Sequence, residues 1–332
     1  MQQYHAPRWL IGGNSQTIWP ALFSQRHAGP APRFVRERWD TPDGDFIDVD
    51  WLDAPPGPPG PAGTGRAGAP LLVLFHGLEG SSASHYAQSF ADAARQRGWR
   101  YAVPHFRGCS GEPNRAPRAY HSGDYEEIGW ILAHMRARQG APVIAVGVSL
   151  GGNALLRWAE ETGAAAATTA SAVAAISAPV DLAAGGAAIG QGFNRHTYTR
   201  MFLRTMKAKA VDMLARHPGL FDRQQMLSAR TLHDFDNIFT APLHGFRDTD
   251  DYWARASAKP HLHRIRIPAL VLNALNDPFV PASSLPRARD VSGCVTLWQP
   301  LHGGHVGFPA GGWPGHVLTL PEQVLDWMRT HI

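Results

Sequence analysis

A serine lies at the centre of a short glycine pattern that can support nucleophilic catalysis. Residues 147–151 read G-x-S-x-G, with Ser149 between Gly147 and Gly151. In this pattern the serine occupies a sharp turn from a strand to a helix, and the glycines let the two elements approach closely. The turn exposes the hydroxyl above the sheet, and the N–H of Leu150 at the helix N-terminus can stabilise an oxyanion. We therefore expect Ser149 to be the nucleophile of a reaction that passes through an acyl-enzyme.

A second oxyanion donor is expected in the loop that follows an early buried strand. Residues 75–80 occupy that position and read FHGLEG. Gly77 lets the backbone turn back, so the N–H of Leu78 is the expected second donor. His76 is interpreted as a structural histidine beneath the loop, because the mechanism requires the backbone here and not an imidazole.

A serine hydroxyl needs a base to take its proton and an acid to orient that base. These partners follow the serine in the order acid, then histidine. Asp277, just past a predicted buried strand, is the expected acid, with Asp181 as the alternative. His305, in the glycine-rich residues 301–308, is the expected base, and His302 is its expected structural neighbour. No metal site is predicted, because no third ligand of matching spacing accompanies these histidines.

Strands and helices alternate along most of the chain and must position these residues. We predict strands at residues 33–39, 46–51, 71–75, 100–104, 142–147, 173–178, 269–273 and 295–298. We predict helices at residues 84–96, 124–138 and 150–161, near residue 283, and from residue 321 onward. The first two strands flank a turn and form an antiparallel pair, and the Pro/Gly-rich residues 55–70 form a mobile surface connection. The other strands are continuous apolar runs, which favours an α/β fold whose mostly parallel sheet has helices on both faces.

The alternation stops at about residue 187 and resumes after residue 258. We interpret residues 187–258 as an inserted helical cap on a core of residues 33–186 and 259–332, with residues 1–32 as an N-terminal segment. The cap interleaves apolar with basic side chains: Tyr198, Met201, Phe202, Met206 and Leu214 with Arg200, Arg204, Lys207, Lys209 and Arg216. Such a helix can pack on the core, and it can also line an acyl pocket while its basic face contacts a lipid surface.

Composition excludes several classes of protein. The chain has 332 residues, of which 44% are hydrophobic, so it can bury a sizeable core and is not disordered throughout. A formal net charge of +4 without a dense basic block gives no reason to expect a nucleic-acid partner. Cys109 and Cys294 cannot form a disulfide framework, and no signal peptide or convincing membrane span is found, so we expect a cytoplasmic protein.

Six stretches of the chain resemble the YheT-like esterase branch of the α/β-hydrolase fold: residues 76–81, 107–111, 147–153, 239–246, 276–278 and 303–308. Residues 13–20 also resemble that branch, although Ser15 stands where a histidine is more usual. The resemblance implies hydrolysis of carboxylic esters with short- to medium-chain acyl or lipid-like groups, with Ser149, Asp277 and His305 as charge-relay residues. No cofactor is needed for this chemistry. Acyl transfer by the same triad and a catalytically inactive binding protein remain alternatives, and the oligomeric state is left open.

Overall fold

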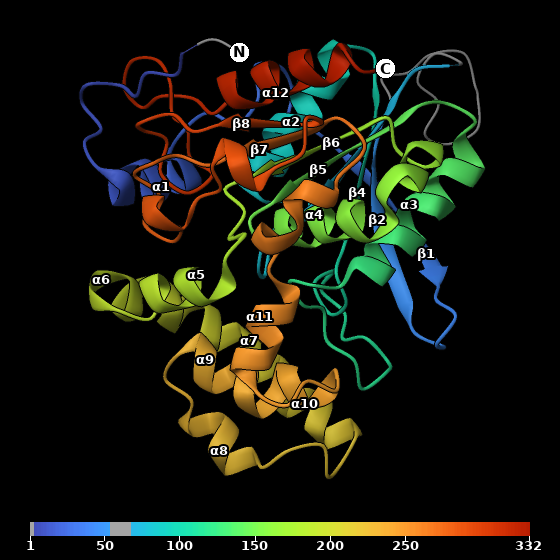
Figure 1. The fold of residues 1–332 in the computed structure, drawn as a ribbon, viewed down its shortest axis with the longest axis vertical. Coiled ribbons are helices and arrows are strands. Elements are labelled where there is room, and N and C mark those ends of the chain that lie inside the picture. The colour runs from blue at the N-terminus through green and yellow to red at the C-terminus, as the bar shows by residue number, and fades with distance from the viewer. Residues whose placement is uncertain (1–2, 54–67) are drawn as a thin grey trace.

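The computed structural model describes residues 3–53 and 68–332 and is built around an eight-stranded sheet (Figure 1). The strands are β1 (Phe34–Asp40), β2 (Phe46–Leu52), β3 (Leu71–Phe75), β4 (Arg100–Pro104), β5 (Val143–Val148), β6 (Ala172–Ile176), β7 (Ala269–Leu272) and β8 (Val295–Trp298). Their order across the sheet is β1-β2-β4-β3-β5-β6-β7-β8. β2 pairs antiparallel with β1 and with β4, and every other pairing is parallel. The predicted mostly parallel sheet and its antiparallel first pair are therefore confirmed.

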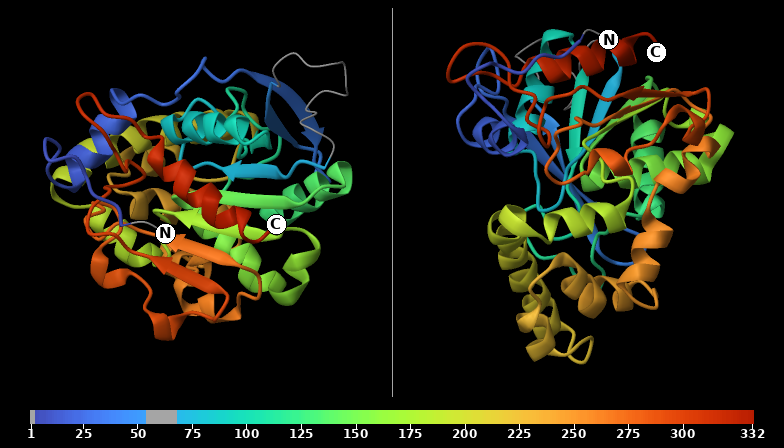
Figure 2. Two further views of the ribbon diagram at one scale, coloured as in Figure 1. Left: turned by 90° about the horizontal axis from the view of Figure 1, so that it is seen from above. Right: turned by 60° about the vertical axis from the view of Figure 1, so that its left-hand side comes forward.

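Helices cover both faces of this sheet (Figure 2). On one face lie α2 (His85–Gln96) and α12 (Thr319–Arg329), and on the other lie α3 (Tyr125–Gln139) and α4 (Leu150–Thr162). Alternate residues of β3 serve the two faces: Leu72 and Leu74 pack with α2 and α12, whereas Val73 and Phe75 pack with α3 and α4. A strand that is buried on both faces must be apolar at every position, which explains the uninterrupted run LLVLF.

A group of helices inserted between β6 and β7 covers one end of the sheet (Figure 1). We call these helices the cap: α5 (Leu182–Ile189), α6 (Gly192–Asn194), α7 (Arg200–Arg216), α8 (Arg223–Ser228), α9 (Leu232–Phe235), α10 (Ala241–Leu243) and α11 (Thr249–Ala256), with π-helical turns at η2 (Arg195–Thr199) and η3 (Asp236–Thr240). The cap has an apolar cluster of its own, in which Leu203, Met213 and Met226 pack with Phe235 and Phe239. Its first helix, α5, begins at Leu182, before residue 187. Leu182 packs on Tyr252 and Trp253 of α11, which makes α5 part of the cap.

The helix predicted near residue 283 is wrong. Two short 3-10 turns stand there instead, η5 (Ala282–Ser284) and η6 (Ala288–Asp290). Pro281 and Pro286 leave only residues 282–285 between them, and a proline both lacks an N–H and disfavours the helical conformation of the residue before it. Two further 3-10 turns, η1 (Gly163–Thr168) and η4 (Lys259–Arg264), flank β6 and β7.

The N-terminal segment contains a helix that the sequence did not predict, α1 (Gly13–Leu22). It lies beside the C-terminal loops, at the opposite side of the molecule from β1 (Figures 1 and 2). The connection predicted at residues 55–70 falls almost entirely outside the described residues. Among the residues that the structure describes, none of the helices is long and apolar enough to cross a membrane.

Candidate active site

Ser149 occupies the turn between β5 and α4 in a strained backbone conformation, with φ at 54°. Its N–H donates to the carbonyl of Ile176 on the neighbouring strand at 2.8 Å, which fixes the turn against the sheet. A side chain on Gly147 would overlap the carbonyl of Gly151, and one on Gly151 would overlap the carbonyl of His76. Both flanking glycines are therefore required by close backbone approach, which explains the spacing of the G-x-S-x-G pattern.

The structure brings Ser149, His305 and Asp277 into one chain of hydrogen bonds. His305 Nε2 lies 3.0 Å from Ser149 Oγ, and His305 Nδ1 lies 2.9 Å from Asp277 Oδ2. A carboxylate only accepts hydrogen bonds, so Nδ1 carries the ring proton and Nε2 is free to accept from the serine hydroxyl. Asp277 Oδ1 accepts from the N–H groups of Phe279 at 2.8 Å and Val280 at 3.2 Å. Both carboxylate oxygens are thus held, and with them the orientation of the imidazole.

The alternative acid and base lie outside this chain of hydrogen bonds. His302 is exposed, and its Nδ1 is 3.5 Å from the Asn276 side chain. Asp181 caps α5 by accepting from the N–H of Ala184 at 3.1 Å, and its other oxygen lies 3.5 Å from Lys259 Nζ. Within the described ranges, no group of three His, Cys, Asp or Glu side chains is placed to hold a metal ion.

The two expected oxyanion donors lie on either side of Ser149. Leu150 is the first residue of α4, so its N–H has no acceptor within the helix. The loop that carries Leu78 approaches from β3, and a side chain on Gly77 would come within 3.2 Å of Ser149 Cβ. Neither the Leu78 N–H nor the Leu150 N–H has a hydrogen-bond acceptor in the part of the chain that the structure describes. An ester oxygen placed over Ser149 could accept from both donors.

His76 lies fully buried beneath this loop. Its Nδ1 donates to the carbonyl of Gly77 at 2.8 Å, and its Nε2 accepts from the N–H of Phe106 at 3.1 Å. Burial lowers the pKa of His76 to about 3, so the ring stays neutral and keeps its acceptor nitrogen. The imidazole therefore connects this loop to the loop that follows β4, and both of its ring nitrogens are used in doing so.

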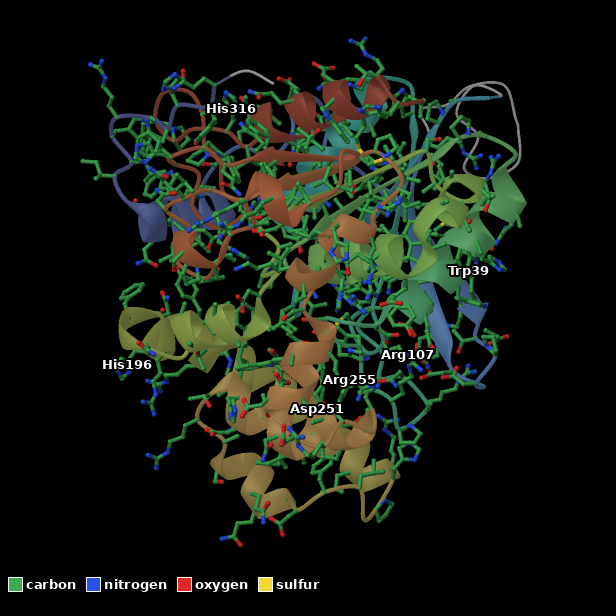
Figure 3. All side chains as sticks on the ribbon, viewed as in Figure 1. Trp39, Arg107, His196, Asp251, Arg255 and His316 are labelled. Atoms are coloured by element: carbon green, nitrogen blue, oxygen red, sulfur yellow. The ribbon has the colours of Figure 1, made fainter. Side chains whose placement is uncertain are left out.

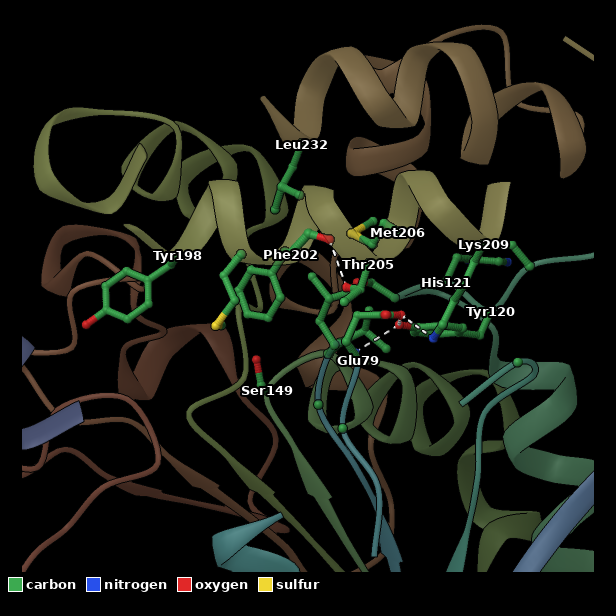
Figure 4. Close-up of a pocket in the computed structure, with 18 of the residues that line it drawn as sticks. Glu79, Tyr120, His121, Ser149, Tyr198, Phe202, Thr205, Met206, Lys209 and Leu232 are labelled. Carbon is green, nitrogen blue, oxygen red and sulfur yellow. Dashed lines mark hydrogen bonds and ion pairs between the residues drawn. The ribbon is translucent and has the colours of Figure 1, made fainter. Parts of the chain in front are cut away.

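A cluster around Glu79 connects the same loop to the cap (Figure 4). Glu79 has a positive φ of 56°, and its N–H donates to Tyr120 Oη at 3.0 Å. The Tyr120 hydroxyl donates in turn to Glu79 Oε1 at 2.8 Å, and Lys209 of α7 forms an ion pair with the same oxygen at 2.8 Å. The backbone next to Leu78 is thereby fixed by a residue of the core and a residue of the cap.

Sequence reasoning missed the residues of α1 that hold the His305 loop. Gln16 Oε1 accepts from the N–H of Gly303 and from the Asn276 side chain, both at 2.9 Å. Thr17 Oγ1 accepts from the N–H of His305 at 2.8 Å. The contact is so close that a side chain on Gly307 would overlap the carbonyl of Gln16. The only signal of this role was the resemblance of residues 13–20 to the esterase branch, which carries no information about what they contact.

Within residues 107–111, one of the stretches that resemble the esterase branch, Arg107 has a structural role. Arg107, labelled in Figure 3, is buried and pairs with Asp45 at 2.9 Å, with Asp43 at 2.8 Å and with Glu127 at 2.6 Å. These pairs connect the turn between β1 and β2 to α3. Arg107 therefore fixes the loop after β4 below the pocket.

A cavity of about 1000 Å³ lies between Ser149 and the cap. Side chains of α7 hang over the serine, among them Phe202, Thr205 and Met206 (Figure 4). Much of the apolar lining comes from α1, the cap and the loop after β7: Ile18, Leu22, Leu182, Ile189, Met201, Phe202, Met206, Leu232, Phe235, Phe239 and Phe279. Other apolar cap residues pack within the cap itself, as Phe221 does on Phe239 and Phe246 on Tyr252.

A nucleophile turn at the carboxyl end of a central parallel strand, with an acid and a histidine on the loops after later strands, defines the α/β-hydrolase class. The chain belongs to this family: residues 70–311 match the alpha/beta hydrolase fold model. It also belongs to the YheT-like esterase branch, since it is 39% identical to YheT of Escherichia coli (strain K12), which is named as a candidate esterase. That match covers 96% of this chain and 90% of the relative.

More distant relatives and solved structures agree with this family. Phospholipase ABHD3 of Mus musculus is 29% identical over all of this chain and 79% of its own length. The esterase Pf2001 of Pyrococcus furiosus superimposes with a TM-score of 0.55 at 14% identity, covering 93% of this chain and 97% of that one. At that level of identity the structural match shows the shared fold alone.

Proposed function

We propose that this protein is a serine hydrolase that cleaves carboxylic esters through an acyl-enzyme on Ser149. The observation that carries the proposal is the unbroken series of hydrogen bonds from Ser149 Oγ through the His305 ring to Asp277, with distances of 3.0 and 2.9 Å. This arrangement needs no cofactor, because the base, its orienting acid and the oxyanion donors all belong to the chain.

The reaction follows from the positions of these groups. Ser149 Oγ attacks the ester carbonyl while His305 Nε2 takes its proton, and Asp277 stabilises the imidazolium that forms. The N–H groups of Leu78 and Leu150 donate to the oxyanion of the tetrahedral intermediate. His305 then protonates the leaving alcohol. A water molecule, activated by the same histidine, releases the acid from the acyl-enzyme.

The pocket favours an apolar acyl group as the part of the substrate held above the serine. Its volume of about 1000 Å³ and its apolar lining from α1 and the cap suit short- to medium-chain or lipid-like acyl chains. The names of the relatives, an esterase and a phospholipase, are consistent with this class of substrate.

Covalent labelling tests the proposal directly. A fluorophosphonate probe should label the wild-type protein on Ser149 and should not label Ser149→Ala, whose thermal unfolding should remain cooperative. A wild-type protein that takes up no probe and does not hydrolyse p-nitrophenyl butyrate would identify an inactive member of the fold. Product analysis in the presence of added alcohols distinguishes ester hydrolysis from acyl transfer, because an acyltransferase would form new esters in place of the free acid.

A further inference from the structure

An aromatic and aliphatic surface surrounds the outer side of α1. It consists of six side chains, which we call the aromatic face: Trp9, Ile11, Trp19, Leu22, Phe23 and Trp313. Ile11 is 85% exposed, Trp313 75% and Leu22 62%, values at which a monomeric soluble protein leaves single apolar residues but seldom a group of them. The rings touch one another, with Trp19 centroids 5.7 Å from Trp9, 4.6 Å from Phe23 and 6.4 Å from Trp313.

The aromatic face is fixed in position by the protein itself. The indole N–H of Trp9 donates to the carbonyl of Gly311 at 3.2 Å, and that of Trp19 donates to the carbonyl of Pro314 at 2.8 Å. These two tryptophans therefore satisfy their polar atoms internally and present their apolar rings outward. A surface that is already ordered loses little side-chain entropy when it is covered.

The aromatic face continues into the mouth of the active-site pocket. Ile18, Ala21 and Leu22 of α1 line the pocket, and Leu22 is also part of the face. Met201 and Phe202 of α7 line the pocket as well, and Met201 is 50% exposed. An apolar molecule lying against α1 therefore has an apolar path towards Ser149.

Three segments that contribute to the aromatic face and the pocket carry no acidic residue, whereas Glu79, Glu112 and Asp212 line other parts of the pocket. Residues 1–36, 182–211 and 291–321, which supply α1, the first cap helices and the His305 loop, contain no aspartate or glutamate. The first two segments carry exposed or half-buried arginines, among them Arg8, Arg26, Arg195, Arg200 and Arg204. Exposed Trp and Phe rings on segments that carry arginines and no carboxylates match the chemistry of an anionic lipid surface, where aromatic rings lie at the headgroup level.

We propose that the aromatic face docks onto an anionic lipid bilayer and that apolar substrates pass from the bilayer into the pocket along α1. Contact through α1 differs from the contact expected through the basic face of the cap, on which Arg200 and Arg204 are exposed. The docking goes beyond the proposed ester hydrolysis and requires no catalytic step.

Flotation of the full-length protein with vesicles tests the docking. The wild type should float with vesicles of equimolar phosphatidylcholine and phosphatidylglycerol, and less with phosphatidylcholine alone. Phe23→Ser/Trp313→Ser should reduce the affinity at least about tenfold, since two apolar side chains no longer enter the bilayer. The matched control is Val35→Ser, which removes a side chain that is 51% exposed on β1, far from the mouth; it should float like the wild type.

Two further measurements keep the docking separate from folding and from catalysis. Both variants should hydrolyse water-soluble p-nitrophenyl acetate at the wild-type rate, which shows that they are folded, and Ser149→Ala should float like the wild type. In the wild type, brominated phospholipids should quench tryptophan fluorescence, and Trp313→Phe should weaken that quenching while the protein still floats. The absence of flotation by the wild type, or equal affinity of Phe23→Ser/Trp313→Ser, would overturn the proposal.

Discussion

The side chain of Thr17 holds the backbone of His305, although 288 positions of sequence separate them. Thr17 Oγ1 accepts from the His305 N–H at 2.8 Å and donates to the carbonyl of Gly13 at 2.7 Å. α1 contributes no reacting group, yet it fixes the loop from which the expected base projects. We therefore regard Thr17 as a positioning residue.

Replacing Thr17 by valine should lower kcat about tenfold or more with little change in KM, because a loop displaced by less than an ångström misaligns the base and leaves the pocket intact. Valine matches the shape of threonine but cannot accept a hydrogen bond. Steady-state kinetics on p-nitrophenyl butyrate provide the measurement. Thr17→Ser retains the oxygen and should keep most of the activity; equal losses in both variants would mean that the methyl group matters and the hydrogen bond does not.

Alanine variants of the two neighbouring histidines should behave very differently. His305→Ala should lose activity by several orders of magnitude, because it removes the ring nitrogen that lies 3.0 Å from Ser149 Oγ and takes its proton. His302→Ala should keep most of its activity, since that ring is exposed and its Nδ1 lies beside Asn276, away from Ser149. The measurement is the initial rate of each variant at a saturating ester concentration, compared with that of the wild type. The opposite ranking would assign the base to His302.

The acid is tested by a pair of isosteric changes. Asp277→Asn keeps an oxygen for the N–H groups of Phe279 and Val280 but favours the wrong imidazole tautomer, which costs up to about 10⁴-fold in kcat in serine proteases. Asp181→Asn should change kcat little, because Asn also caps helices well. Comparable losses in the two variants would contradict the assignment of Asp277.

Acyl-chain length should control the specificity constant. Each methylene buried in the pocket contributes about 0.8 kcal/mol, or roughly fourfold, so kcat/KM should rise from acetyl through butyryl to medium-chain esters and then fall. Met206→Trp, which fills part of the pocket, should shift the optimum to shorter chains. Leu227→Trp, at an exposed position of α8, should not. A flat profile from acetyl to decanoyl esters, or amides cleaved faster than esters, would refute an acyl pocket.

Acid should destabilise the fold through three histidines buried in the neutral form. Burial lowers the pKa of His76 and of His244 to about 3 and that of His85 to about 4. Below pH of about 6.5 these rings are protonated in the unfolded chain before they are protonated in the folded one. Each therefore costs up to about 1.4 kcal/mol of unfolding free energy per unit fall in pH, until its folded pKa is reached.

Urea unfolding between pH 7 and pH 4.5 measures this loss. His76→Asn keeps a donor near the position of Nδ1 for the carbonyl of Gly77, loses the acceptor for Phe106, and does not titrate. Its unfolding free energy should therefore fall less steeply with pH. The slope should be smaller than that of the wild type by about 1.4 kcal/mol per pH unit, the value for one proton. An identical slope in the variant would show that His76 does not contribute.

The parts of the fold that were predicted correctly are those with local signals. The run LLVLF predicts the strand β3, because burial on both faces requires an apolar residue at every position. The G-x-S-x-G pattern predicts the Ser149 turn, because close backbone approach requires glycine at both flanking positions. The pairing of Asp277 with His305 was expected from chain order and from the position of each residue in a loop after a predicted strand. Whether these residues react as proposed stays a prediction until the kinetics are measured.

Contacts between distant segments left no such signal. Gln16 and Thr17 act on residues 303–305 through single hydrogen bonds, and nothing in the spacing of either segment identifies its partner. The Lys209–Glu79 ion pair joins the cap to the core in the same way. Near residue 283 the alternation of strands and helices favoured a helix, but Pro281 and Pro286 interrupt the backbone hydrogen bonds that a helix requires.

The contact of α1 with the His305 loop also affects when the site becomes active during folding. Closing a loop of nearly 290 residues is an encounter that a chain makes late, after the local strand and helix pairs of the sheet have formed. A newly made chain can thus assemble its sheet and its nucleophile turn while its base is still misaligned. We therefore expect refolding to restore the sheet before it restores ester hydrolysis, because the expected base is aligned only when α1 meets the His305 loop.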